Sequence, residues 1–123
     1  MSAEIVNIML TLRNQIKIYH WETMSFSRHK ATDKLVDKLD DAIDTFVEVY
    51  IGKYGRPNLT AKTGRIQLRN YKDEEASALL QEAINWLTNK LPTLLKPNDT
   101  DLLNIRDEIL AHLNQTLYLF TFH

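Results

Sequence analysis

The first 51 residues contain neither glycine nor proline, and this absence constrains the fold more than any other feature of the sequence. Glycine and proline are the residues that most often interrupt helices and strands. All three glycines and the first proline fall within residues 52–64, and the other two prolines are Pro92 and Pro97. The chain is therefore predicted to begin with long helices and to have its breaks in these two places.

Apolar residues recur at steps of three and four in four segments, which is the spacing of one face of a helix. The first such stripe is Ile5, Met9, Leu12, Ile16 and His20. Ser25 or Ser27, Asp73, and Asn98 or Asp99 precede the later stripes and are candidate N-caps. These patterns predict helices over about residues 2–23, 28–51, 73–91 and 99–121.

The lengths of the connections predict how these helices are arranged. The first and third connections are short, which favours antiparallel neighbours, whereas residues 52–71 form a long connection that lets the second helix pair cross over. Together these features predict an all-α fold with a single domain over residues 1–123, namely a ferritin-like four-helix bundle with a long crossover connection. A simple up-down bundle is the structural alternative.

The composition limits the kinds of metal site that the chain can build and the kinds of partner that it can bind. The chain has no cysteine, so any metal site must be built from histidine and carboxylate side chains. The net charge of −1 gives no overall attraction to nucleic acid, and the basic residues Arg65, Arg69 and Lys72 are expected to be solvated rather than to bind it. No apolar run is long enough to cross a membrane, and the N-terminus does not resemble a signal peptide, which together favour a cytoplasmic protein.

Two of the four histidines, His20 and His29, lie nine positions apart around a short polar break. Imidazole is a frequent ligand of transition metals, so the pair is a candidate metal site. The alternative for His20, which continues the first apolar stripe, is a hydrogen-bonded core residue. The alternative for His29, at the start of the second helix, is an exposed position with no ligand role.

The second predicted helix carries acidic residues that share one face: Asp37, Asp41, Asp44 and Glu48. A run of charges is most often a solvated face. Asp44 and Glu48 are four residues apart and stand among apolar neighbours, which is a common way to hold a divalent cation. The acidic face is thus either a solvated surface or the carboxylate part of a metal site.

The order His20-Trp21, His29, Asp44, Glu48 resembles the ferroxidase motif of the Dps-type mini-ferritins. The resemblance continues into residues 55–57, "GRP", where that family has a glycine- and proline-containing turn. It implies a ferritin-like bundle, a two-fold dimer and iron ligands shared between subunits. The reaction that it implies is oxidation of Fe(II) by peroxide or dioxygen.

Carried over by position, His20 and His29 would be ligands from one subunit, and Asp44 and Glu48 ligands from its partner. Trp21, Asp41 and Asp37 would then lie in the shell around them. Iron is the metal that the resemblance implies, with another divalent metal as the alternative.

The chain departs from the Dps pattern in several respects. The two histidines are closer in sequence by about one helical turn, the glycine usual in that stretch is missing, and there is no lysine-rich tail. The resemblance therefore extends to a homodimer or larger homo-oligomer, but not to a full shell or to DNA protection. The chain is also similar to short ferritin-like proteins of large DNA viruses and phages, which would place it in the host cytoplasm or the virion.

Geometry adds one constraint to this hypothesis. If His29 and Asp44 lie on one continuous helix, they are about 22 Å apart along its axis and cannot bind the same ion. A two-fold dimer with antiparallel helix pairs would bring each histidine pair to the partner's carboxylates. The competing hypothesis is a non-catalytic helical dimer that serves as a structural or protein-interaction module.

Overall fold

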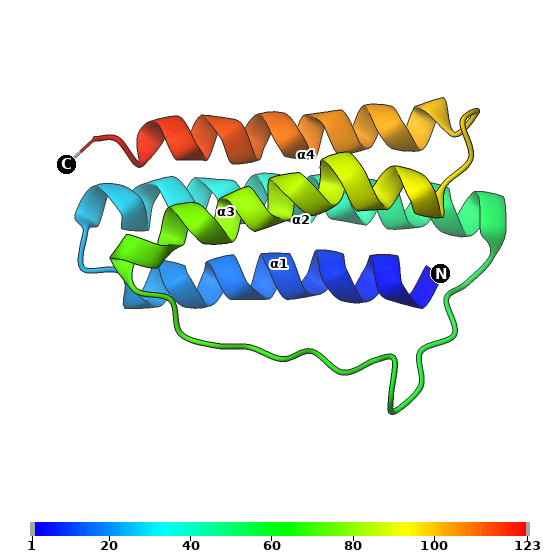
Figure 1. Cartoon of the computed structure of the whole chain (residues 1–123), viewed down its shortest axis with the longest axis horizontal. Helices are drawn as coiled ribbons and strands as arrows, with labels where there is room; N and C mark the ends of the chain where they lie inside the picture. The colour runs from blue at the N-terminus through cyan, green and yellow to red at the C-terminus, as the bar shows by residue number, and fades with distance from the viewer. Residues whose placement is uncertain (1, 123) are drawn as a thin grey trace.

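The computed structural model describes residues 2–122, and within that range the chain is helical with no strand. The four main helices are α1 (Ser2–Glu22), α2 (Phe26–Tyr54), α3 (Ala76–Asn85) and α4 (Thr100–Leu119). The predicted all-α helical bundle is confirmed (Figure 1).

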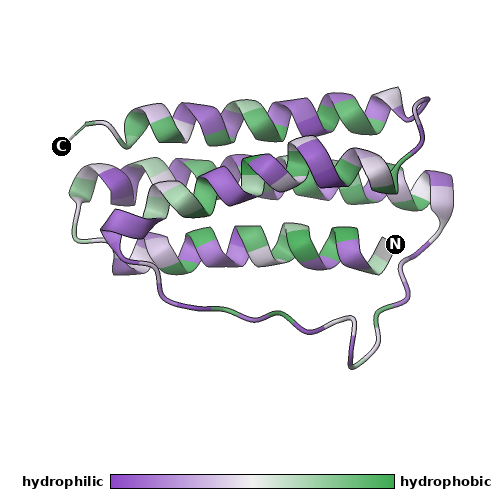
Figure 2. Ribbon diagram, viewed as in Figure 1, coloured by the Kyte–Doolittle hydropathy of each residue, from purple (hydrophilic) through white to green (hydrophobic). Residues whose placement is uncertain are grey.

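The helices pack as a bundle around α2, which lies against both α1 and α4, while α3 packs on α4. Figure 2 shows apolar and polar residues alternating along every helix, as the sequence spacing predicts. Leu39 and Phe46 of α2 are fully buried, as are Leu102 and Leu113 of α4. The core is therefore built from the predicted stripes.

Residues 55–72 connect α2 to α3 and run back along the length of α1 (Figure 1). The Asn7 side chain donates to the backbone carbonyls of Thr63 and Arg65 near one end of α1. Further along, the Gln15 amide donates to the Arg69 carbonyl and accepts from the Arg69 N–H. Because the connection returns to the starting end of α2, α2 and α3 point in the same direction.

The predicted helix boundaries are correct at the start of the chain and wrong in two later places. α2 continues through Gly52 and ends only at Gly55, whose φ of 88° is a conformation that glycine adopts readily. The third segment is not one α-helix. A 3₁₀ turn η1 (Asp73–Glu75) precedes α3, and a π-helical turn η2 (Trp86–Lys90) and a 3₁₀ turn η3 (Leu91–Leu94) follow it.

Pro92 accounts for the irregular end of the third segment. Proline has no N–H to donate, and its ring clashes with the carbonyl four residues earlier in a regular helix. The preceding turn widens instead, and the Leu91 N–H donates to the Trp86 carbonyl five residues back. The regular α-helix therefore ends at Asn85, seven residues before Pro92. Pro92 itself lies in the 3₁₀ turn η3.

Candidate functional site

The two predicted histidine ligands lie side by side at one end of the bundle. His20 is in the last turn of α1 and His29 in the first turn of α2, on either side of the turn over residues 23–25. Their rings stack with centroids 3.9 Å apart and planes 16° from parallel. The Ser25 hydroxyl accepts from the Arg28 N–H and begins α2, which places His29 opposite His20.

Each ring is held by the other histidine's backbone. His20 Nδ1 lies 2.8 Å from the His29 carbonyl oxygen, and His29 Nδ1 lies 2.9 Å from the His20 carbonyl oxygen. A carbonyl oxygen only accepts hydrogen bonds, so each Nδ1 must carry the hydrogen. In the neutral rings the lone pair is then on Nε2, which is the atom that a metal would bind.

Among residues 2–122, the acidic side chain that approaches the pair is that of Asp33. The Asp33 Oδ1 is 3.8 Å from Nε2 of His20, and the Asp33 side chain is 58% exposed. His20 itself is buried, with 5% of its surface exposed, and His29 is half-buried. Asp33 is not among the residues predicted for the site, although its position four residues after His29 puts it on the same helix face.

A carboxylate from a distant segment fixes the turn between the histidines. Asp73, at the start of η1, accepts hydrogen bonds from the Tyr19 hydroxyl at 2.7 Å, the Thr23 hydroxyl at 2.5 Å and the Met24 N–H at 3.3 Å. Burial alone would raise the pKa of Asp73, but these hydrogen bonds outweigh it and hold the pKa below its usual range. Asp73 thus ties the turn to the far end of the long connection, and it does not act as the predicted N-cap.

Arg28 reinforces the same corner. Its guanidinium donates to the Tyr19 hydroxyl and to the Asp73 carbonyl, at 3.1 and 2.7 Å. It also lies over the Phe120 ring, 4.6 Å from the centroid. The residue just before His29 therefore joins α1, α2, η1 and the end of α4, and the histidine pair lies at the corner where these elements meet.

The predicted carboxylate ligands lie elsewhere on the same helix. Asp44 and Glu48 are exposed on α2, and their carboxylates form no hydrogen bond or ion pair with any other residue between 2 and 122. Because α2 is continuous, His29 and Asp44 are about 22 Å apart along its axis. Within the described range, no three histidine, aspartate or glutamate side chains come close enough together to hold an ion.

The residues predicted to surround the ligands are also dispersed. Trp21 is 67% exposed, and Lys17 Nζ lies 5.4 Å from the centre of its ring. Asp37 is exposed on α2, and Asp41 borders a depression between α2 and α4 together with Glu108. In one copy of residues 2–122, the structure brings together the two histidines and Asp33 but does not bring the other predicted residues to them.

Among the described residues, none of the helices combines the length and apolar character needed to cross a membrane. No curated protein and no solved structure matches the chain. Residues 20–120, which contain both histidines, Asp44 and Glu48, match the family described as "Family of unknown function (DUF5856)". Since that match covers most of the sequence, the chain belongs to the DUF5856 family.

Proposed function

We propose that this chain binds divalent iron as a substrate at a site completed by a second copy, and that it oxidises the iron as Dps-type mini-ferritins do. The observation that carries the proposal is the reciprocal Nδ1 to carbonyl hydrogen bonding of His20 and His29. A histidine that binds a metal usually donates its other ring N–H to a carbonyl or carboxylate, which fixes the ring and its tautomer. Both rings have this arrangement.

The donor set suits iron. Imidazole nitrogens and carboxylate oxygens bind Fe(II), and they also bind Zn²⁺ and Mn²⁺, so the ligands define a class of metals rather than one element. His20 and His29 would supply two imidazole nitrogens, and the exposed Asp33 carboxylate, 3.8 Å from His20, would have to move closer to supply one oxygen, because the three side chains as they stand do not enclose an ion. Asp44 and Glu48 of the partner subunit would supply the remaining oxygens.

The outer face of α2 favours this completion. His29, Asp33, Asp37, Asp44 and Glu48 all fall within about a third of the helix circumference. If two α2 helices pack antiparallel along this stripe, the histidine end of one helix meets the carboxylate end of the other. The two-fold axis then passes near Asp37, halfway between the two ligand groups.

The helix order is also compatible with a ferritin-like bundle. Such bundles contain two antiparallel helix pairs joined by one long connection. Here residues 55–72 run the length of α1, so that α3 starts at the same end as α2 (Figure 1). This arrangement supports the ferritin-like assignment over the simple up-down alternative.

The proposed reaction needs an oxidant that the site itself does not supply. For each molecule of hydrogen peroxide, two Fe(II) ions lose one electron each, and the peroxide takes up two protons to give two molecules of water. The protein's part is to hold Fe(II) and the oxidant together and to stabilise Fe(III) with carboxylates. Asp44 and Glu48, both exposed, are accessible for that role.

An anaerobic titration with Fe(II), followed by calorimetry, tests the proposal. We expect saturable binding that is lost in the His20→Ala/His29→Ala double variant. The matched control is His112→Ala, which removes a half-buried imidazole from α4 and should leave binding unchanged. Absence of saturable binding to the unsubstituted protein, or equal loss in the control, would refute the iron site.

The second candidate function is the non-catalytic interaction module, and a surface feature favours it. The α1–α2 turn and the end of α4 lie at the same end of the bundle (Figure 1). These two segments carry five exposed large apolar side chains: Trp21, Met24, Phe26, Tyr118 and Phe122. The Ser27 hydroxyl donates to the Phe122 carbonyl, which confirms that the two segments meet. A stable dimer that forms without any metal response in the titration would support this alternative.

A further inference from the structure

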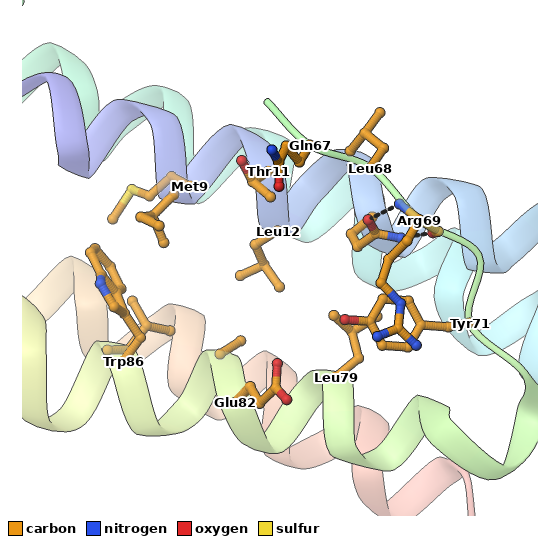
Figure 3. A pocket seen from close by; sticks show the side chains of 14 residues that line it. Met9, Thr11, Leu12, Gln67, Leu68, Arg69, Tyr71, Leu79, Glu82 and Trp86 are labelled. Atoms are coloured by element: carbon orange, nitrogen blue, oxygen red, sulfur yellow. Dashed lines mark hydrogen bonds between the residues drawn. The ribbon is translucent and has the colours of Figure 1, made fainter. Parts of the chain in front are cut away.

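A groove beside α1 takes no part in the proposed iron site. It lies between α1 and α3 under residues 67–71, and its volume is about 400 Å³ (Figure 3). That volume falls within the usual range for small-molecule sites, about 300–1,000 Å³. α1 and α3 are not one of the closely packed helix pairs of this bundle, so their facing apolar residues leave this space between them.

The groove is framed by fixed structure. Its outer edge is the irregular segment around Arg69, which is joined to the buried Gln15 of α1 by two hydrogen bonds. At one end of the groove, Trp86 opens the π-helical turn η2. Because Pro92 imposes this turn, it also sets the position of Trp86 at the end of the groove.

The lining defines the class of ligand. Met9 and Leu12 of α1 face Leu79 of α3 across the groove, and Trp86 and Tyr71 stand at opposite ends (Figure 3). Ala83 also lines the groove. Two charged side chains at the edge of the groove, Arg69 and Glu82, differ in whether they are free to pair with a ligand. The Arg69 guanidinium already lies over Tyr71 and pairs with Glu75, whereas the Glu82 carboxylate has no hydrogen bond or ion pair with the rest of residues 2–122.

We propose that this groove binds an organic cation with an apolar body, in the manner of an alkylammonium ion. The alkyl part lies between the apolar side chains of α1 and α3, from Trp86 to Tyr71, and burial of that part supplies most of the affinity. The ammonium group lies beside Glu82, which selects a cation over an anion. This ligand site is independent of the proposed iron chemistry, because the groove includes neither His20 nor His29.

Tryptophan fluorescence tests the proposal directly. The chain has two tryptophans, and Trp21→Phe leaves Trp86 as the only reporter. Titration of this variant with decylammonium below its micelle concentration should change the Trp86 emission in a saturable way. Decanoate, which has a similar chain and the opposite charge, should bind more weakly.

Two pairs of variants in the Trp21→Phe background locate the site. Ala83→Phe places a ring in the groove and should lower decylammonium affinity about ten-fold or more, whereas Ala78→Phe on the exposed surface of α3 should not. Glu82→Gln should reduce the preference for decylammonium over decanoate by about two- to five-fold, the contribution of an exposed ion pair. Glu74→Gln, also exposed, is its control.

Three results would overturn the proposal: no saturable change in emission, equal effects of Ala83→Phe and Ala78→Phe in folded proteins, or tighter binding of decanoate. Sedimentation of the same variants tests whether a second copy of the chain fills the groove instead. If Ala83→Phe but not Ala78→Phe dissociates an oligomer, the groove is filled by a second copy of the chain and the ligand assignment is wrong.

Discussion

Asp99 shows how one buried carboxylate joins two parts of the bundle. It is 1% exposed and accepts hydrogen bonds from Lys53 Nζ at 2.6 Å, the Tyr54 hydroxyl at 2.5 Å and the Lys96 N–H at 2.8 Å. Burial would raise the pKa of Asp99, but these donors outweigh it and lower the pKa to about 2. The end of α2 is thereby tied to the turn that precedes α4.

We predict that Asp99→Asn lowers the free energy of unfolding at pH 7 by about 1–3 kcal/mol, because the donors around a buried acceptor lose their charged partner. The pKa of Asp99 is lower in the folded chain than its ordinary value of about 3.9, so its stabilisation is complete above that value and is lost as the pH falls from about 4 towards 2. Urea unfolding at pH 7 and near pH 2 should therefore show a difference between the two proteins that shrinks in acid.

Asp101→Asn is the matched control, since Asp101 also contacts Lys53 but is 54% exposed. An exposed ion pair contributes less than about 1 kcal/mol to the free energy of unfolding. If both variants lower the free energy of unfolding equally, burial of Asp99 does not strengthen its interactions and the explanation is wrong.

The residues around the candidate site differ in how far the sequence could predict them. His20 and His29 were predicted because their spacing is local and visible in the sequence, and the structure stacks their rings. Asp73 was predicted as an N-cap, but its partners Tyr19 and Thr23 lie about fifty positions away. A contact across such a distance depends on the path of the long connection, and no local spacing encodes it.

Asp73 offers a test of whether the corner positions the histidines. Asp73→Asn exchanges an acceptor of three hydrogen bonds for an amide with one acceptor oxygen, and the turn over residues 23–25 should loosen. If the histidine pair binds Fe(II), we expect affinity to fall about ten-fold, as for other outer-shell partners. Glu74→Gln, one residue further on and exposed, should change neither affinity nor unfolding. Unchanged Fe(II) affinity in Asp73→Asn would show that the corner does not position the ligands.

At the scale of the elements, the apolar stripes predicted that the helices exist, but not where all of them end. Burial of a stripe stabilises a helix as a whole, so periodicity gives its position and its inner face. An end depends on one or two backbone conformations. In α2 the sequence offers Gly52 and Gly55 as alternatives, and the helix passes through the first and ends at the second.

These two glycines should respond in opposite ways to the same substitution. Gly52→Ala lies inside α2 with nothing within 4 Å of the added methyl group, so it should raise the free energy of unfolding by about 1 kcal/mol. Gly55→Ala also has room, but its φ of 88° is strained for alanine and should lower that free energy by about 1–3 kcal/mol. Urea unfolding of the two variants measures both values. Shifts of the same sign would mean that α2 ends elsewhere in solution.

At the scale of the whole molecule, the hypothesis of an iron site requires a dimer. One copy brings the histidines together at one end of the bundle, and α2 carries Asp44 and Glu48 about 22 Å away along its axis. Antiparallel pairing of two α2 helices about an axis near Asp37 would create two equivalent sites, each with histidines from one copy and carboxylates from the other. Each site would therefore be lost through substitution of the histidines in one copy or of the carboxylates in the other.

Complementation between two inactive variants tests this arrangement. The His20→Ala/His29→Ala and Asp44→Ala/Glu48→Ala proteins should each bind no Fe(II) alone. After equal mixing and free exchange of subunits, half of the dimers are mixed, and each mixed dimer has one intact site and one site that lacks both halves. Binding should then recover to about a quarter of the unsubstituted level, since only one site in four is intact. His20→Ala mixed with His29→Ala should recover none, because every site keeps a missing histidine. If exchange is confirmed by mass spectrometry and the first mixture still binds nothing, the ligands do not meet across a two-fold axis.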